Sequence, residues 1–228
     1  MTVMYSFPHA GGSAANFKAF SREFPEKVAI VRPVELPGRG LRAGEPFSKD
    51  LESCVDSTLQ QLPFEIGARF LLHGHCMGAL LAFEAVKALE RSGRPLPDAL
   101  IVSGRNAPGY QTDWGLRVAN LPDREFFDEL RAVGGVPPGL SFAMAAQFLT
   151  IIREDQRIVH GYRPNDSSIS TPILVLAGED DGMTRPDFLE HWAKFSATKV
   201  EVKMMKGGHY FIYNQAPAFA EALLAFEK

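Results

Sequence analysis

The chain has 228 residues, 46% of them hydrophobic, and a formal net charge of −3. This length suits one domain with a sizeable core, and the lack of any lysine or arginine run argues against nucleic acid or an anionic membrane surface as partner. No stretch reaches the roughly 18 apolar residues that span a bilayer, and the N-terminus lacks the features of a signal peptide, so we expect a soluble, cytoplasmic protein.

Short apolar runs and longer helical patterns alternate along the chain. Rich in β-branched and aromatic residues, the runs predict strands at 3–7, 28–36, 70–73, 99–104, 173–178 and 200–205. Apolar residues at three- and four-residue spacing predict helices at 14–24, 50–62, 77–92, 185–195 and 216–227. This alternation indicates an α/β fold in which a mostly parallel central sheet is flanked by helices on both faces.

The segment from about residue 108 to residue 161 interrupts that alternation. Two helical patterns, 123–133 and 142–159, surround the irregular stretch "GGVPPGLS". We expect a helical insertion within a single domain of residues 1–228. Its phenylalanines and leucines are either ordinary core residues or the inner face of a lid over an acyl tunnel, and its position in the chain favours the lid.

The stretch "GHCMG" joins the strand at 70–73 to the helix at 77–92. Gly74, Cys76 and Gly78 have the spacing of the G-x-S-x-G nucleophile elbow, where small residues allow a sharp turn from strand to helix. Cys76 occupies the position of the nucleophile. Because this position lies at a helix N-terminus, we expect the pKa of its thiol to be lowered.

Other interpretations exist for the residues around the elbow. Cys76 could be a small buried hydrophobic residue, or a metal ligand beside His73 and His75, although the sequence offers no second ligand cluster. We expect these two histidines, and His160, to be packing or surface residues. Cys54 is expected to be a packing residue, and two cysteines form no disulfide framework, which fits a reducing compartment.

A thiol nucleophile needs a base and an acid that orients it. "KGGHYF" after the last strand provides His209 as the general base, and "ILVLAGEDDG" ends a buried strand with two candidate acids, Asp180 and Asp181. His9 is a weaker candidate base. The order of nucleophile, acid and histidine along the chain is that of α/β-hydrolases.

The loop "SFPHAGGS" after the first strand contains a glycine pair that lets the backbone approach a ligand. We expect the backbone N–H groups of Ala10 and Met77 to form an oxyanion hole. The triad and these donors suffice for acyl transfer, so we expect no metal, nucleotide or redox cofactor.

Several separate motifs carry a resemblance to a known family. They are "FPHAGGSAANF", "VELPGRGLRAGEP", "GHCMGALLAFE", "VSGRNAP", "LPDREFFDELRAVGGVP", "GEDDG" followed by "HWAKFS", and "KGGHYFI". Over nearly its whole length the sequence resembles the type II thioesterases of polyketide and nonribosomal peptide assembly lines. The resemblance implies an α/β-hydrolase fold with a helical lid and removal of stalled or incorrect acyl groups from the phosphopantetheine arm of acyl or peptidyl carrier proteins.

The resemblance also assigns roles to single residues. The nucleophile of the family falls on Cys76, its base on His209, and its acid on Asp181, which lies three residues after Gly178. The sequence departs from the family in two of these motifs. A cysteine replaces the usual serine, and Gly182 follows the acid where a proline often stands.

The cysteine widens the range of outcomes. Attack by Cys76 on a thioester produces another thioester, which water can hydrolyse or an amine, thiol or hydroxyl can intercept. Hydrolysis is therefore the first hypothesis, acyl transfer or cyclising release the second, and a non-catalytic acyl-binding module the third. A cysteine installed in place of serine to trap an acyl-enzyme would give the same sequence.

The expected partner is an acyl carrier or peptidyl carrier protein, with a free coenzyme A thioester as the alternative substrate. We expect Arg39 and Arg42 in "LPGRGLR" to be ordinary surface-loop charges, with contact to the acidic surface of the carrier as the alternative.

Overall fold

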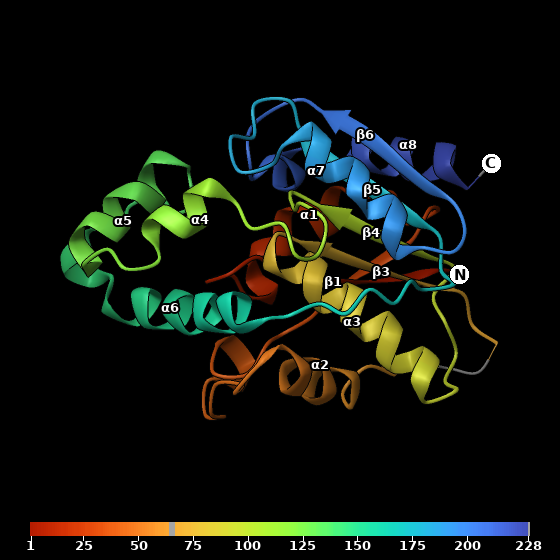
Figure 1. The fold of residues 1–228 in the computed structure, drawn as a ribbon, viewed down its shortest axis with the longest axis horizontal. Helices are drawn as coiled ribbons and strands as arrows, with labels where there is room; N and C mark the ends of the chain where they lie inside the picture. The colour runs from red at the N-terminus through yellow and green to blue at the C-terminus, as the bar shows by residue number, and fades with distance from the viewer. Residues whose placement is uncertain (64–66, 228) are drawn as a thin grey trace.

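The computed structural model describes residues 1–63 and 67–227. Their strands form one sheet in the order β2-β1-β3-β4-β5-β6, and every neighbouring pair runs parallel (Figure 1). The strands are β1 Val3–Phe7, β2 Ile30–Pro33, β3 Phe70–His75, β4 Ala99–Ser103, β5 Ile173–Gly178 and β6 Val200–Met205.

Helices cover both faces of the sheet because strand side chains alternate between them. Phe70 and Leu72 of β3 belong to the core cluster beneath α2 and α3, whereas Leu71 between them belongs to the cluster beneath α1 and α8. The helices outside the insertion are α1 Lys18–Glu23, α2 Leu51–Leu59, α3 Met77–Arg91, α7 Pro186–Glu190 and α8 Ala216–Phe226. The expected α/β architecture is confirmed.

Several predicted boundaries shift, among them those of the second strand and of two helices that contain 3₁₀ turns. The second strand extends only over Ile30–Pro33, and the missing N–H of Pro33 is tolerated because β2 is an edge strand. The helix expected at 14–24 begins as a 3₁₀ turn, Ala14–Phe17, and the one expected at 185–195 continues past α7 as the 3₁₀ turn His191–Phe195.

The helical insertion contains α4 Asp113–Val118, α5 Asp123–Ala132, the 3₁₀ turn Phe142–Met144 and α6 Ala146–Gly161. α4 and α5 lie apart from the sheet, and α6 leads back toward it (Figure 1). The insertion has an apolar cluster of its own, in which α5 contributes Phe126 and Phe127 and α6 contributes Leu149 and Ile152. Within residues 1–63 and 67–227, no helix combines the length and apolar character needed to cross a bilayer.

The carboxyl ends of the parallel strands meet at one edge of the sheet, where α/β proteins place their ligands. Ala10 follows β1, Cys76 follows β3 and Arg105 follows β4, while Asp181 and His209 follow β5 and β6. Residues distant in sequence therefore converge on this edge.

Candidate active site

Cys76 occupies a strained corner between β3 and α3. Its backbone has φ 54° and ψ −112°, and no other residue except glycine has a positive φ in the described part of the chain. A side chain at Gly74 would collide with the Gly78 backbone, and one at Gly78 would collide with the Phe7 backbone. The two glycines are therefore required by the turn that presents Cys76.

His209 and Asp181 meet beside this corner. His209 Nδ1 lies 2.9 Å from Asp181 Oδ2, and the other carboxylate oxygen accepts a 2.8 Å hydrogen bond from the Met183 amide. Cys76 and His209 line the same cavity, and the charge of each group shifts the pKa of the other. The structure thus brings Cys76, His209 and Asp181 together, whereas Asp180 is exposed.

The protonation states of the three groups depend on one another. Burial alone would raise the pKa of the Cys76 thiol, but the charge and hydrogen bond of His209, together with the charge of Arg105, outweigh burial and lower it. Burial would lower the pKa of His209, but the charge of Cys76 and the hydrogen bond to Asp181 raise it to about 10. Burial likewise opposes the hydrogen bond and charge of His209 at Asp181, whose pKa is lowered. The thiolate of Cys76 and the imidazolium of His209 therefore stabilise each other.

Arg105 is the site residue that sequence reasoning missed. It lines the cavity beside Cys76, and burial lowers the pKa of its guanidinium although the charge of Cys76 opposes this shift. Its Nε is buried and has no hydrogen-bond partner in the described part of the chain. The signal was its place two residues after the end of buried β4, the strand next to the elbow strand.

Cys76 and His209 line a cavity of about 70 Å³. This volume is far below the roughly 300–1,000 Å³ of typical ligand pockets. The helical insertion forms much of its wall, with Trp114 of α4 and His160 of α6. His160, which was expected to be a surface or packing residue, thus lines this cavity. The small volume beside the nucleophile suits a short acyl chain.

Ala10 and Met77 line the same cavity. Neither backbone N–H donates a hydrogen bond in the structure over residues 1–63 and 67–227. Met77 is the first residue of α3, where N–H groups have no intrahelical acceptor and the helix dipole favours negative charge. The two expected oxyanion donors are therefore both unoccupied and adjacent to the thiol.

A family model for the thioesterase domain matches residues 3–226. The chain belongs to the thioesterase family. Gramicidin S biosynthesis protein GrsT of Aneurinibacillus migulanus is 31% identical, with 92% of this chain and 82% of that protein aligned. Thioesterase PikA5 of Streptomyces venezuelae is 30% identical, covering 91% and 74%. The structure of the type II thioesterase BorB from the borrelidin biosynthetic cluster superposes with a TM-score of 0.79 at 29% identity, covering 98% and 90%.

These similarities confirm the resemblance to type II thioesterases, and with it the α/β-hydrolase fold and the expectation of a thioester hydrolase. The thioesterase differs from one expectation at Arg39 and Arg42. Both are buried, at 4% and 6% exposure, and pair with Asp155 and Glu45 respectively. Neither is available to meet a carrier protein, because each guanidinium is already committed within the fold.

Three other histidines of this thioesterase have hydrogen-bond partners of their own. His9 Nδ1 lies 2.6 Å from the Tyr213 hydroxyl, and burial lowers the pKa of His9 to about 3. His73 lies between the hydroxyls of Ser6 and Ser103, at 3.2 and 3.0 Å. His75 bonds to Ser103 as well, and no cluster of three potential metal ligands occurs among the described residues. These contacts support packing roles for His73 and His75.

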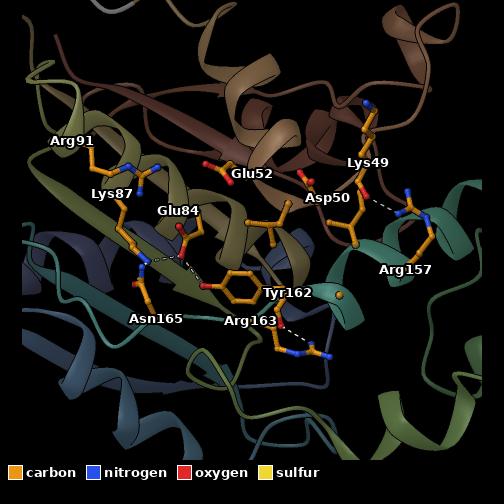
Figure 2. Close-up of a pocket in the computed structure, with 13 residues that line it drawn as sticks. Lys49, Asp50, Glu52, Glu84, Lys87, Arg91, Arg157, Tyr162, Arg163 and Asn165 are labelled. Carbon is orange, nitrogen blue, oxygen red and sulfur yellow. Dashed lines mark hydrogen bonds and ion pairs between the residues drawn. The ribbon is translucent and has the colours of Figure 1, made fainter.

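A larger cavity of the thioesterase lies away from Cys76. It has a volume of about 510 Å³ and is bordered by α2, α3 and the end of α6. Figure 2 shows hydrogen bonds among its polar residues. Glu84 accepts hydrogen bonds from Lys87 and Tyr162, at 2.8 and 2.7 Å. Lys87 also donates to Asn165. These contacts connect α3 to the chain that leaves the insertion.

Cys54, expected to be a packing residue, is buried in α2 at 3% exposure. Burial raises the pKa of its thiol. A buried thiol with a raised pKa is unreactive, so Cys54 does not compete with Cys76 for thiol chemistry.

Proposed function

We propose that this thioesterase hydrolyses acyl groups from the phosphopantetheine arm of acyl or peptidyl carrier proteins in polyketide or nonribosomal peptide biosynthesis. The observation that carries this proposal is Cys76 on its elbow, in one cavity with His209 and two unoccupied backbone N–H donors. The relatives named for gramicidin S biosynthesis and for the borrelidin cluster support the class of pathway.

In the first half-reaction, the Cys76 thiolate attacks the thioester carbonyl and the developing oxyanion accepts hydrogen bonds from the Ala10 and Met77 amides. The intermediate collapses by breaking the bond to the pantetheine sulfur, which takes a proton from the His209 imidazolium. Since one thioester replaces another, this step is nearly balanced in free energy. Asp181 holds the imidazole so that Nε2 faces the sulfur.

In the second half-reaction, neutral His209 removes a proton from water as the water attacks the acyl-Cys76 thioester. The same amides stabilise the second oxyanion. Collapse releases the free carboxylic acid and returns the sulfur as a thiolate beside a protonated imidazole, which restores the resting pair. Deacylation therefore decides whether the acyl group leaves as an acid or passes to another nucleophile.

Intact mass spectrometry with short acyl-pantetheine thioesters, acyl-coenzyme A and acyl-loaded carrier protein tests the proposal. We expect an adduct on Cys76 that decays to free acid in water, with faster turnover on the carrier than on coenzyme A. Cys76→Ala should form no adduct, whereas Cys76→Ser should retain measurable hydrolysis.

Three outcomes would contradict hydrolysis by Cys76. An adduct that persists until an amine or thiol is added would indicate acyl transfer. Binding without adduct or turnover would indicate an acyl-binding module. Undiminished turnover by Cys76→Ala would remove Cys76 from the mechanism.

A further inference from the structure

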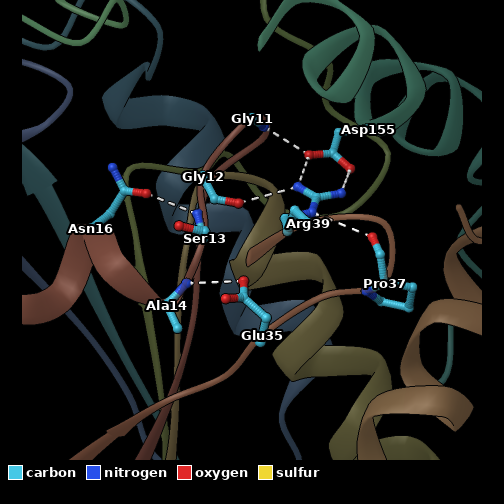
Figure 3. A network of polar contacts seen from close by, with 9 residues as sticks. All are labelled: Gly11, Gly12, Ser13, Ala14, Asn16, Glu35, Pro37, Arg39 and Asp155. Atoms are coloured by element: carbon cyan, nitrogen blue, oxygen red, sulfur yellow. Dashed lines mark hydrogen bonds and ion pairs between the residues drawn. The ribbon is translucent and has the colours of Figure 1, made fainter. Parts of the chain in front are cut away.

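A buried ion pair connects the helical insertion to the sheet side of the molecule. Arg39, in the loop after β2, and Asp155, on α6, lie 116 residues apart and form two parallel bonds of 2.5 and 2.6 Å. They are only 4% and 1% exposed. Figure 3 shows that both side chains point at the glycine-rich loop that follows β1.

The pair holds that loop by its backbone. Asp155 Oδ2 accepts a 2.7 Å hydrogen bond from the Gly11 N–H, and Arg39 Nη1 donates a 3.1 Å hydrogen bond to the Gly12 carbonyl. The peptide groups Ala10–Gly11 and Gly12–Ser13 are therefore held by opposite charges of one ion pair. Because peptide groups are planar, fixing the Gly11 N–H also fixes the carbonyl of Ala10. The 2.9 Å hydrogen bond from the Gly12 N–H to the His9 carbonyl in turn fixes the peptide group that carries the Ala10 N–H.

α6 also packs directly against this loop. A Cβ at Gly11, which has φ +81°, would lie 3.0 Å from Cβ of Ile152. Ile152 and Asp155 are three residues apart and so occupy one face of α6. The glycine thus permits close approach of the helix, and the approach brings Asp155 within reach of the Gly11 amide.

We propose that Arg39 and Asp155 are positioning residues for the oxyanion hole, holding the Ala10 N–H in the direction required to bind the developing negative charge. The inference rests on the proposed function, since it assigns Ala10 the role given above. Neither side chain lines the cavity of Cys76, so both act through the backbone of the loop. The position of α6 is thereby linked to the catalytic competence of the hole.

Asp155→Asn in the full-length protein tests this link. It retains the shape of the side chain but removes the charge that pairs with Arg39. We expect kcat for a short acyl-pantetheine thioester to fall about 10- to 100-fold, less than the roughly 10²–10³-fold loss on deleting an oxyanion donor outright. KM should stay within about twofold, because ground-state binding does not use the hole.

Alkylation of Cys76 by iodoacetamide separates positioning from general disruption, because alkylation forms no oxyanion. Its rate and pH dependence should match the wild type in Asp155→Asn. Arg39→Lys is a second variant that retains the charge but loses the two-bonded fork, and it should lower kcat in the same direction. Asp123→Asn, which removes the exposed ion pair to Arg153 of α6, is the matched control and should leave kcat unchanged.

Wild-type kcat in both Asp155→Asn and Arg39→Lys would overturn the inference. So would a parallel loss of turnover and alkylation, since it would show that the whole site had been disturbed. If Asp155→Asn does not fold, Arg39→Lys and the same two assays decide the matter. Failure of the proposed function is distinguishable, because the wild type itself would then form no acyl adduct.

Discussion

The carboxyl edge of the sheet and the helical insertion contribute to the active site in different ways. At the sheet edge, Cys76 and Asp181 follow the strands β3 and β5, which are buried on both faces, so the backbone dictates where they lie. The insertion packs around its own small apolar cluster and meets the core through α6 and the Arg39–Asp155 pair. We infer that the sheet edge determines the chemistry and that the insertion determines the space available to the acyl group.

The largest effect should come from the sheet edge itself. Asp181→Asn leaves a side chain of the same shape but favours the wrong tautomer of His209, so we expect kcat to fall about 10³- to 10⁴-fold. Steady-state hydrolysis of an acyl-pantetheine thioester measures this loss. Asp180→Asn, one residue away and exposed, is the control, and a larger effect there would reverse the assignment of the acid.

Core truncations should separate the two regions by stability. Leu72→Ala in β3, fully buried beneath α2 and α3, should lower the free energy of unfolding by about 3–5 kcal/mol. Leu149→Ala in the smaller insertion cluster should cost about 2 kcal/mol, at the low end for such changes, since that site can collapse more readily. Urea unfolding monitored by circular dichroism measures both. Equal losses would mean that the insertion is as tightly packed as the core.

Arg105→Gln tests the electrostatics of the edge. With one cation fewer beside the sulfur, the pKa of Cys76 should rise. The rate of iodoacetamide alkylation at neutral pH should therefore fall by about 3- to 10-fold. The midpoint of the pH–rate profile should move to higher pH.

The wild type supplies the internal reference for this profile. The pKa of His209 is raised to about 10 in the folded protein, from an ordinary value near 6.5 in the unfolded chain. Its charged form therefore stabilises the folded state fully below pH 6.5, and this contribution is lost as the pH rises through 10. Arg117→Gln, at an exposed pair with Glu129 of the insertion, should leave the profile unchanged. An unshifted midpoint in Arg105→Gln would remove Arg105 from the site.

The smallest effect should concern acyl-chain length. Trp114→Ala enlarges the cavity beside Cys76, so kcat/KM for medium acyl chains should rise about 3- to 10-fold relative to acetyl, within the range for a few methylene contacts. A series of acyl-pantetheine thioesters of increasing length measures the ratio. Leu116→Ala, on the same helix but 58% exposed, should leave it unchanged, and identical profiles for both variants would contradict the role of the insertion.

The strands and the elbow were predictable from sequence because their signals are local. The short apolar runs of the strands and the glycines on either side of Cys76 are each visible within a few neighbouring residues. The choice of Asp181 over Asp180 came from a family spacing. In the structure it depends on a turn that buries one carboxylate and exposes the other, which residue type alone does not determine.

The residues that sequence analysis misplaced depend on distant partners. Arg39 stands in a glycine-rich loop that has the composition of a surface turn, and its partner Asp155 lies on a helix more than a hundred residues later. Arg105 stands in the motif "VSGRNAP", but nothing in the neighbouring residues indicates that its side chain lines the cavity of Cys76. The helix α4 was missed because it has six residues, one of them Gly115, and begins with a Thr112 cap rather than an apolar repeat.

The positive φ of Cys76 has a thermodynamic meaning beyond catalysis. A backbone held in this region costs about 1–3 kcal/mol for any residue with a side chain, and the cost persists whether or not an acyl group is present. Glycine would relieve it. If stability alone decided the residue at this corner, it would be glycine. The thiol of Cys76 is therefore retained although it lowers the free energy of unfolding.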